Sequence, residues 1–108
     1  MRQIISLAVA FVFFGLVMGT NLNASVIRGK KYYIKLLKTP CGFYGSEMGK
    51  KHTVYEWRNL YKTGQLAAEL QRICPTSKRI QSKKQLKHLS QFLEYFASDS
   101  GNVPSCSQ

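Results

Sequence analysis

The strongest hydrophobic pattern of the chain lies near its C-terminal end, between residues 82 and 98. Apolar residues recur there at i, i+3, i+6, i+7 and i+10, which makes one stripe roughly 120° wide on a helix. These residues are Leu86, Leu89, Phe92, Leu93 and Phe96. Ser82 and Gln85 precede the stripe with the spacing of a helix cap. Because Gly101 and Pro104 favour a stop after it, the pattern predicts a helix over 83–98, on which the rest of the chain folds.

Three shorter helices are predicted upstream. The first spans 28–38, because Tyr33 and Leu37 share one helical face while lysines largely occupy the other. A short strand over 32–34 is the competing interpretation, since these residue types favour strands. A proline drives the preceding residue out of the helical region, so this helix is expected to end at Thr39.

Capping and breaking signals define the two middle helices. Thr53 and Glu56 have the spacing of a capping box, which predicts the start of a helix over 53–62. A further helix is predicted over 65–74, between a glycine break and a proline stop. The segment 46–51 is expected to form one turn.

No segment alternates between apolar and polar residues with the period of a strand, so the chain is predicted to be all-α. The most economical fold is a small orthogonal bundle of about four helices. The residues expected at its centre are Trp57, Phe92, Leu93 and Phe96.

The N-terminal segment 1–24 differs in kind from the rest. Arg2 is followed by an uncharged, almost wholly apolar run, Ile4–Met18, and then by a polar stretch ending at Ala24. This order is typical of a secretory signal peptide cleaved after Ala24. An uncleaved membrane anchor is the alternative, although the run is shorter than the ~20 residues of a spanning helix. The prediction is a signal peptide over 1–24 and one small helical domain over 25–108.

Basic residues outnumber acidic ones throughout the chain. Lysines and arginines number 16 against 5 aspartates and glutamates, a net charge of +11, which falls by one when Arg2 leaves with the signal. Such a chain is attracted to anionic surfaces, phospholipid among them. The basic residues fall into several short clusters and form no single stripe, which favours a solvated surface over a nucleic-acid site. No nucleic-acid partner is therefore expected.

Three cysteines follow the predicted signal: Cys41, Cys74 and Cys106. An exported protein meets an oxidising compartment, in which a pair of cysteines forms a disulfide by default. Cys41 and Cys74 are both expected at helix ends, and their bridge would close a loop of about 33 residues. Pairing Cys74 with Cys106 closes a loop of similar length, but Cys106 lies in a tail that is expected to be frayed. The predicted disulfide is Cys41–Cys74, with Cys106 left as a free or intermolecular thiol.

Few residues suggest chemistry. His52 and His88 are the two histidines of the chain, and with Met48 they are the candidate ligands of a haem or metal. The simpler interpretation is one loop histidine, one surface histidine and a methionine that fills the core. No C-x-x-C-H motif is present, which excludes covalent haem attachment of the usual kind. The carboxylates are isolated in sequence and form no acid–base pair, so no catalytic residue and no enzyme activity are predicted.

Four motifs spread over most of residues 29–106 are Gly29–Tyr33, Gly42–Gly45, Lys51–Trp57 and Tyr95–Cys106. They resemble a group of small exported proteins of epsilonproteobacteria that are usually labelled uncharacterised or cytochrome c-like. The resemblance implies a Gram-negative periplasm and a fold related to small cytochromes c, in which an N-terminal G-x-x-x-Tyr helix crosses a C-terminal helix. The chain departs from cytochromes because Cys41 stands alone, so a cytochrome label would describe ancestry at most.

Three functions are compatible with these features. The preferred hypothesis is a small basic periplasmic helical protein without catalytic machinery or cofactor. It would be an accessory protein that binds an unidentified periplasmic protein, with a component of the respiratory chain as the candidate partner. The second is a non-covalent haem or metal binder that uses His52 with His88 or Met48 in electron transfer. The third is a cationic protein that acts at anionic membrane surfaces.

Overall fold

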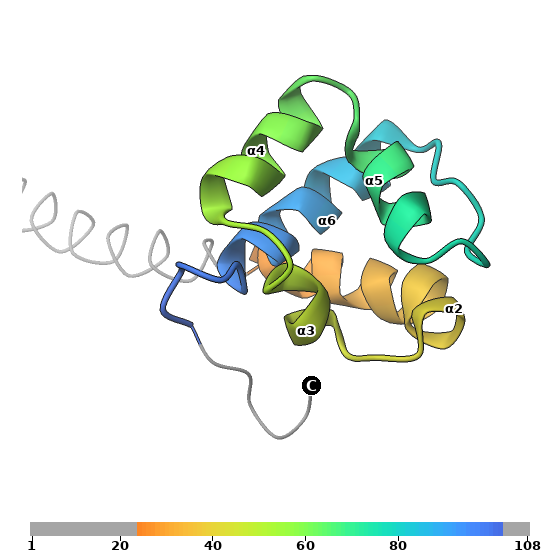
Figure 1. The fold of residues 1–108 in the computed structure, drawn as a ribbon, viewed down its shortest axis with the longest axis horizontal. Helices are drawn as coiled ribbons and strands as arrows, with labels where there is room; N and C mark the ends of the chain where they lie inside the picture. Colours follow the sequence, from red (N-terminus) through yellow and green to blue (C-terminus); the bar gives the residue numbers. More distant parts are fainter. Residues whose placement is uncertain (1–23, 103–108) are drawn as a thin grey trace, which may run out of the picture.

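The computed structural model describes residues 24–102, and residues 1–23 and 103–108 lie outside the described part (Figure 1). The described residues form helices joined by turns and contain no strand. The elements are a helix over 24–33, η1 (Ile34–Lys38), α2 (Thr39–Cys41), α3 (Gly45–Gly49), α4 (Val54–Lys62), α5 (Leu66–Ile73) and α6 (Lys83–Tyr95). The prediction of a small all-α bundle is confirmed. Within residues 24–102, no helix is long and apolar enough to cross a membrane.

Two predictions concern residues outside this part. The predicted signal peptide is described only at its last residue, Ala24. Cys106, the predicted unpaired thiol, also lies outside the described residues. Both stay predictions.

α6 runs through the middle of the molecule, and the other helices pack around it (Figure 1). α4 and α5 lie on one side of α6; α3 and the helix formed by 24–33, η1 and α2, hereafter helix 24–41, lie on the other. The predicted stripe of α6 is buried, with Leu89 and Leu93 wholly inaccessible. Trp57 is also wholly inaccessible, which confirms the predicted centre of the core.

Helix 24–41 crosses α6 at Gly29. A Cβ atom at this position would lie 2.2 Å from the His88 carbonyl oxygen and 2.5 Å from the Cβ atom of Phe92. Glycine, which has no Cβ, lets the two backbones approach this closely. One turn further on, the ring of Tyr33 packs 5.9 Å from that of Phe92. An N-terminal helix therefore crosses the C-terminal one, whereas a relation to cytochromes stays a prediction.

Helix 24–41 is longer than predicted. It is already helical at residue 24 and continues through Thr39 and Pro40 to Cys41. Thr39 keeps helical torsion angles (φ −67°, ψ −51°) although a proline follows it. The π-helical turn η1 widens the backbone just before Pro40 and so makes room for the proline ring. It also shifts the carbonyl group of the preceding turn, with which the ring would clash in a regular α-helix. The predicted end at Thr39 and the competing strand are both wrong, and the helix ends at Gly42 with a left-handed φ of 79°.

α3, a helix of five residues, lies where the sequence suggested one turn. Its glycines weaken helix propensity but permit close packing. A Cβ atom at Gly49 would lie 2.7 Å from that of Phe96, so α3 sits tightly against α6. The carbonyl of Gly49 accepts a hydrogen bond from the Trp57 indole nitrogen (2.8 Å). This contact joins α3 to α4 and satisfies the polar atom of the buried tryptophan.

The predicted starts of the three later helices are confirmed. Thr53 and Glu56 form the capping box in both directions, at 3.1 and 2.9 Å. The Ser82 hydroxyl accepts a hydrogen bond from the backbone N–H of Gln85 at the start of α6. α5 begins immediately after the break at residues 64–65, as expected.

α6 ends at Tyr95, three residues before the predicted end. The Asn102 side chain donates to the Tyr95 carbonyl (2.9 Å) and so satisfies one of the carbonyl groups left free at the end of a helix. Gly101 is left-handed, with φ 78°, but it belongs to the turn that brings Asn102 back rather than to the helix end. The helix therefore ends where a side chain from the following turn caps it.

The segment after α6 returns to the start of α4. The Ser98 N–H donates to the His52 carbonyl (3.0 Å), and the Val54 N–H donates to Asp99 Oδ1 (2.9 Å). Asp99 thus satisfies a second free N–H group of α4 beside the capping box. This hydrogen bond joins residues that are 45 apart in sequence and holds the segment after α6 against the start of α4.

Cys41 and Cys74 form a disulfide, as predicted. It joins the end of helix 24–41 to the residue that follows α5 and closes a loop of 33 residues. Both cysteines stand at helix ends, where the backbone meets its neighbour without distorting a helix.

Candidate binding groove

The turn between α4 and α5 forms one wall of a groove. Gly64 adopts a left-handed φ of 74°, and the N–H of Gln65 reaches back to the Leu60 carbonyl (2.8 Å). This pattern ends α4 sharply and lets α5 begin two residues later. The last turn of α4 and the first turn of α5 are therefore held side by side.

The link between α5 and α6, residues 75–82, forms the other wall. Its first part is fixed by the Ser77 hydroxyl, which donates to the Cys74 carbonyl (2.7 Å). Its last part is fixed by Ile80, which is buried in the core. Arg79, immediately before Ile80, is thus carried on an anchored stretch of backbone.

Between these walls lies a groove of about 570 Å³, a volume within the range of natural ligand pockets. We call it the cationic groove. Its apolar lining comes from the end of α4, the start of α5, the link and the first turn of α6. The apolar side chains are Tyr61, Leu66, Ala67, Ile80 and Leu86. Most of them are buried or half-buried, so they form its floor.

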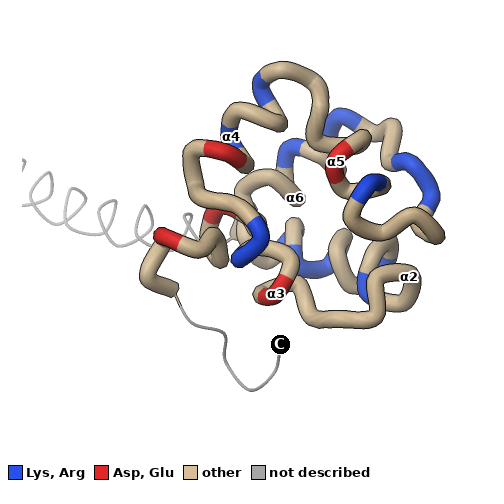
Figure 2. Tube along the Cα trace, viewed as in Figure 1, with Lys and Arg blue, Asp and Glu red and all other residues tan. Residues whose placement is uncertain are grey.

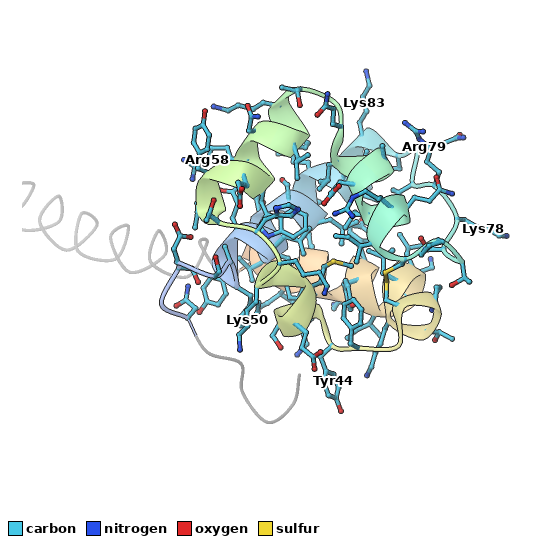
Figure 3. The ribbon with its side chains drawn as sticks, viewed as in Figure 1. Tyr44, Lys50, Arg58, Lys78, Arg79 and Lys83 are labelled. Carbon is cyan, nitrogen blue, oxygen red and sulfur yellow. A yellow bond between two sulfur atoms is a disulfide. The ribbon has the colours of Figure 1, made fainter. Side chains whose placement is uncertain are left out.

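Three exposed basic residues, Lys62, Arg79 and Lys83, also line the groove, and none of its lining residues is acidic. The ion pairs of the described residues involve His52, Arg58 and Arg72 instead. Within residues 24–102, no carboxylate therefore neutralises the three cations. Figure 3 shows Arg79 and Lys83 at the upper right of the molecule, and Figure 2 shows that this side of the trace is mainly basic, whereas most acidic positions lie towards the left.

The groove combines two properties that together select one kind of ligand. Guanidinium and ammonium groups bind carboxylate or phosphate through charge-assisted hydrogen bonds. An apolar group that binds on the buried apolar floor is removed from water, which is favourable. The arrangement suits an anionic group with an apolar side chain next to it.

His52 occupies a different place, between α4 and α5. Its Nε2 atom lies 2.6 Å from Glu69 Oε2, and its Nδ1 atom lies 3.5 Å from Glu56 Oε1. Its ring meets Trp57 edge-on, with 4.7 Å between the centroids. Both ring nitrogens thus face carboxylates, which makes His52 a bridge between two helices.

Glu69 is the most strongly perturbed carboxylate of the described residues. Arg72 grips it with two hydrogen bonds, from Nε (2.7 Å) and Nη2 (2.6 Å). The bonds from Arg72, followed by the one from His52, hold the pKa of Glu69 at about 2, although its burial opposes this. Glu69 is therefore ionised at neutral pH and well below it.

His88 lies where α6 meets the beginning of helix 24–41. Its Nδ1 atom is 2.9 Å from the Ser25 hydroxyl, which also contacts the Gln91 side chain. The ring of Tyr32 packs beside it, at 6.1 Å. Burial and the nearby charge of Arg28 lower the pKa of His88, which favours the neutral ring.

The candidate ligands are not brought together. His52 and His88 each have their own polar partners on different elements. Met48 is wholly inaccessible in the core, as the simpler interpretation expected. Among the described residues, no group of three or more His, Cys, Asp or Glu side chains could hold a metal ion.

Two of these features had no signal in the sequence. His52 and Glu69 are 17 residues apart, a spacing that no helical or turn pattern connects. Lys62, Arg79 and Lys83 belong to three separate segments and look like scattered surface charge. The one hint of the groove was Ile80, an apolar residue in an otherwise polar, basic link. Comparison of the chain with protein-family models, curated proteins and solved structures gives no significant match.

Proposed function

We propose that this chain is a small exported accessory protein that binds an acidic partner protein through the cationic groove. The observation that carries the proposal is the set of three unneutralised cations, Lys62, Arg79 and Lys83, above an apolar floor. Charge of one sign steers an oppositely charged partner, and the floor supplies the apolar contact that makes a complex stable.

The partner segment that fits is short, acidic and centred on one apolar side chain. Two carboxylates could pair with Arg79 and Lys83 while the apolar side chain enters between Leu66 and Ile80. Arg79 offers a planar fork that holds a carboxylate in one orientation, whereas Lys83 acts as a point charge. A component of the respiratory chain remains the candidate partner.

Other features support a binding role. Glu56 caps α4, Glu94 pairs with Arg58, and Glu69 pairs with Arg72. Each of these carboxylates is bound to a partner within the fold, so we assign it a structural role and not a catalytic one. The disulfide between helix 24–41 and α5 supports an oxidising compartment such as the periplasm.

The test is site-specific photo-crosslinking in intact cells. Benzoylphenylalanine replaces Gln81, which lines the groove, or Tyr55, which is 73% exposed on α4 away from it. We expect a discrete adduct from position 81 but not from position 55, with an acidic protein identified in the adduct by mass spectrometry. The double variant Arg79→Gln/Lys83→Gln should remove that adduct.

A matched control is the double variant Lys31→Gln/Lys38→Gln, which removes the same charge from helix 24–41 at positions that share no hollow with Arg79 or Gln81. It should leave the adduct from position 81 in place. The proposal is wrong if the adduct survives neutralisation of the groove, forms equally from position 55, or does not form at all.

A further inference from the structure

The outward face of helix 24–41 carries exposed isoleucines between lysines. Ile27 and Ile34 expose 50% and 44% of their surface, and Lys31 and Lys35 are exposed beside them. The opposite face of the helix holds the buried Tyr33 and Leu37. The isoleucines therefore do not belong to the core.

This face continues beyond the helix to Tyr44, which is 50% exposed. The Lys38 ammonium lies 5.1 Å from the centre of the Tyr44 ring, and a hollow lined by Ile34, Lys38 and Tyr44 joins the helix to the loop. We call this surface the Ile–Lys face; it consists of Ile27, Lys31, Ile34, Lys35, Lys38 and Tyr44. In Figure 3, Tyr44 lies at the lower edge of the molecule, away from Arg79 and Lys83.

The charge of the Ile–Lys face has one sign. The first acidic residue of the whole chain is Glu47, so helix 24–41 and the loop after it contain five basic residues and no acidic one. None of these five takes part in an ion pair of the described residues. Whatever covers this face must supply negative charge over the length of a helix together with an apolar surface for the isoleucines.

We propose that the Ile–Lys face docks the protein on an anionic lipid bilayer, with helix 24–41 lying in the plane of the surface. Ile27 and Ile34 enter the boundary between headgroups and acyl chains, as the apolar residues of interfacial helices do. The lysines extend their stems along this boundary and keep their ammonium groups at the lipid phosphates. Tyr44 has the apolar ring and polar tip that suit the same depth.

The position of this face along the chain favours a bilayer over a protein as its occupant. The apolar run Ile4–Met18 ends six residues before Ala24. Six residues span at most roughly 20 Å, so the helix starts close to a bilayer whenever the run is held in it, as an anchor or as a signal before cleavage. The groove is lined by other elements, namely α4, α5, the link and α6. The two surfaces come together only at Lys35, which lines a hollow with Arg79 and Gln81.

The experiment measures co-sedimentation with lipid vesicles, using protein isolated from cells that express the full chain. Vesicles of phosphatidylcholine containing phosphatidylglycerol as the minor, anionic component are compared with phosphatidylcholine alone, at low and at physiological salt. We expect binding to the anionic vesicles only. The double variant Ile27→Ser/Ile34→Ser should weaken it about tenfold, since each side chain loses part of its apolar burial.

Further variants test whether vesicle binding requires this face, or whether net charge or any exposed apolar residue is enough. Lys31→Gln/Lys35→Gln should weaken vesicle binding by about tenfold or more at low salt, because each lysine near an anionic surface contributes to binding. Arg79→Gln/Lys83→Gln has the same net charge and should bind vesicles like the unchanged protein. Tyr55→Ser removes an exposed apolar residue of α4 and should also have no effect.

The inference is wrong if wild-type protein does not sediment with the anionic vesicles, or binds neutral vesicles equally well. It is also wrong if Lys31→Gln/Lys35→Gln and Arg79→Gln/Lys83→Gln lose vesicle binding to the same extent. Binding would then depend on net charge and not on the Ile–Lys face. Because the groove variant tests the partner and the helix variants test the bilayer, each proposal can fail without the other.

Discussion

Glu69 shows what a single residue contributes when two elements meet at it. It lies on α5, it is gripped by Arg72 one turn later, and it faces His52 in the segment before α4. Its neighbours in sequence gave no sign of this role, because a carboxylate on a helix is ordinarily a solvated surface group. The bond to Arg72 follows from i, i+3 spacing and could have been anticipated. The bond to His52 depends on how α4 and α5 pack and could not.

The low pKa of Glu69 predicts an acid-sensitive contribution to stability. The folded-state pKa, about 2, lies below the ordinary value of 4.5. The ionised form is therefore favoured by folding: its contribution is complete above pH 4.5 and is lost as the pH falls towards 2. Arg72 is largely exposed, so water screens the pair and we expect about 1–2 kcal/mol.

Glu69→Gln should lower the free energy of unfolding by this amount at pH 7 and flatten its decline between pH 4.5 and 2. Urea unfolding at pH 7, 4.5 and 3 measures both effects. Glu47→Gln, on the exposed side of α3, is the control and should leave the pH dependence as it is. If the two variants show the same pH dependence, Glu69 has no special role.

At the scale of elements, local signals in the sequence predicted most of what formed. The capping box at Thr53, the break at Gly64 and the stripe of α6 are short-range patterns, and each fixed a helix boundary or a buried face. Pro40 is the instructive failure, because a proline usually ends a helix. The π-helical turn before it absorbs the proline, and nothing local distinguishes a proline that is absorbed in this way from one that stops a helix.

The crossing of helix 24–41 over α6 depends on one missing Cβ atom. Gly29→Ala would place a methyl group against the His88 carbonyl, which belongs to the backbone of α6 and cannot move aside alone. We expect a loss of about 3 kcal/mol or more in the free energy of unfolding, the upper range for overpacking. Chemical denaturation measures it.

Gly42→Ala is the matched control for that substitution. No atom lies within 4 Å of a Cβ placed there, so its cost comes from the positive φ alone and should be about 1 kcal/mol. Equal losses at the two positions would show that the crossing tolerates a side chain.

At the scale of the whole molecule, the two proposed surfaces are built from different elements and meet at Lys35, which lines a hollow with Arg79 and Gln81. The sequence indicated the excess of positive charge but placed it in scattered clusters. The fold gathers Lys62, Arg79 and Lys83 around the groove and sets Lys31 and Lys35 beside exposed isoleucines. The grouping around the groove could not be predicted, because it depends on which segments the turns bring together. The lysines and isoleucines share one helix, so their helical spacing could have shown that they lie together. An accessory protein built in this way would hold a partner while resting on a membrane.

The Cys41–Cys74 disulfide was predictable, because both cysteines were expected near helix ends, although the first of these ends lies two residues later than predicted. Its effect should reach the groove. The bridge ends at Cys74, where the link that carries Arg79 begins, and Ser77 ties the link to the Cys74 carbonyl. Without the bridge, the link loses one of its anchors and Arg79 loses its fixed position.

Cys41→Ala/Cys74→Ala should therefore lower the free energy of unfolding by about 3–4 kcal/mol, the chain-entropy value for a loop of this length. At temperatures where the variant stays folded, the groove adduct from position 81 should also weaken, whereas vesicle binding through the Ile–Lys face should persist. Cys106→Ser is the control, and its melting temperature should equal that of the unchanged protein. If Cys106→Ser destabilises the protein as much as the double variant does, the tail beyond residue 102 is part of the structural framework. In that case the bridge is not what holds the link in place.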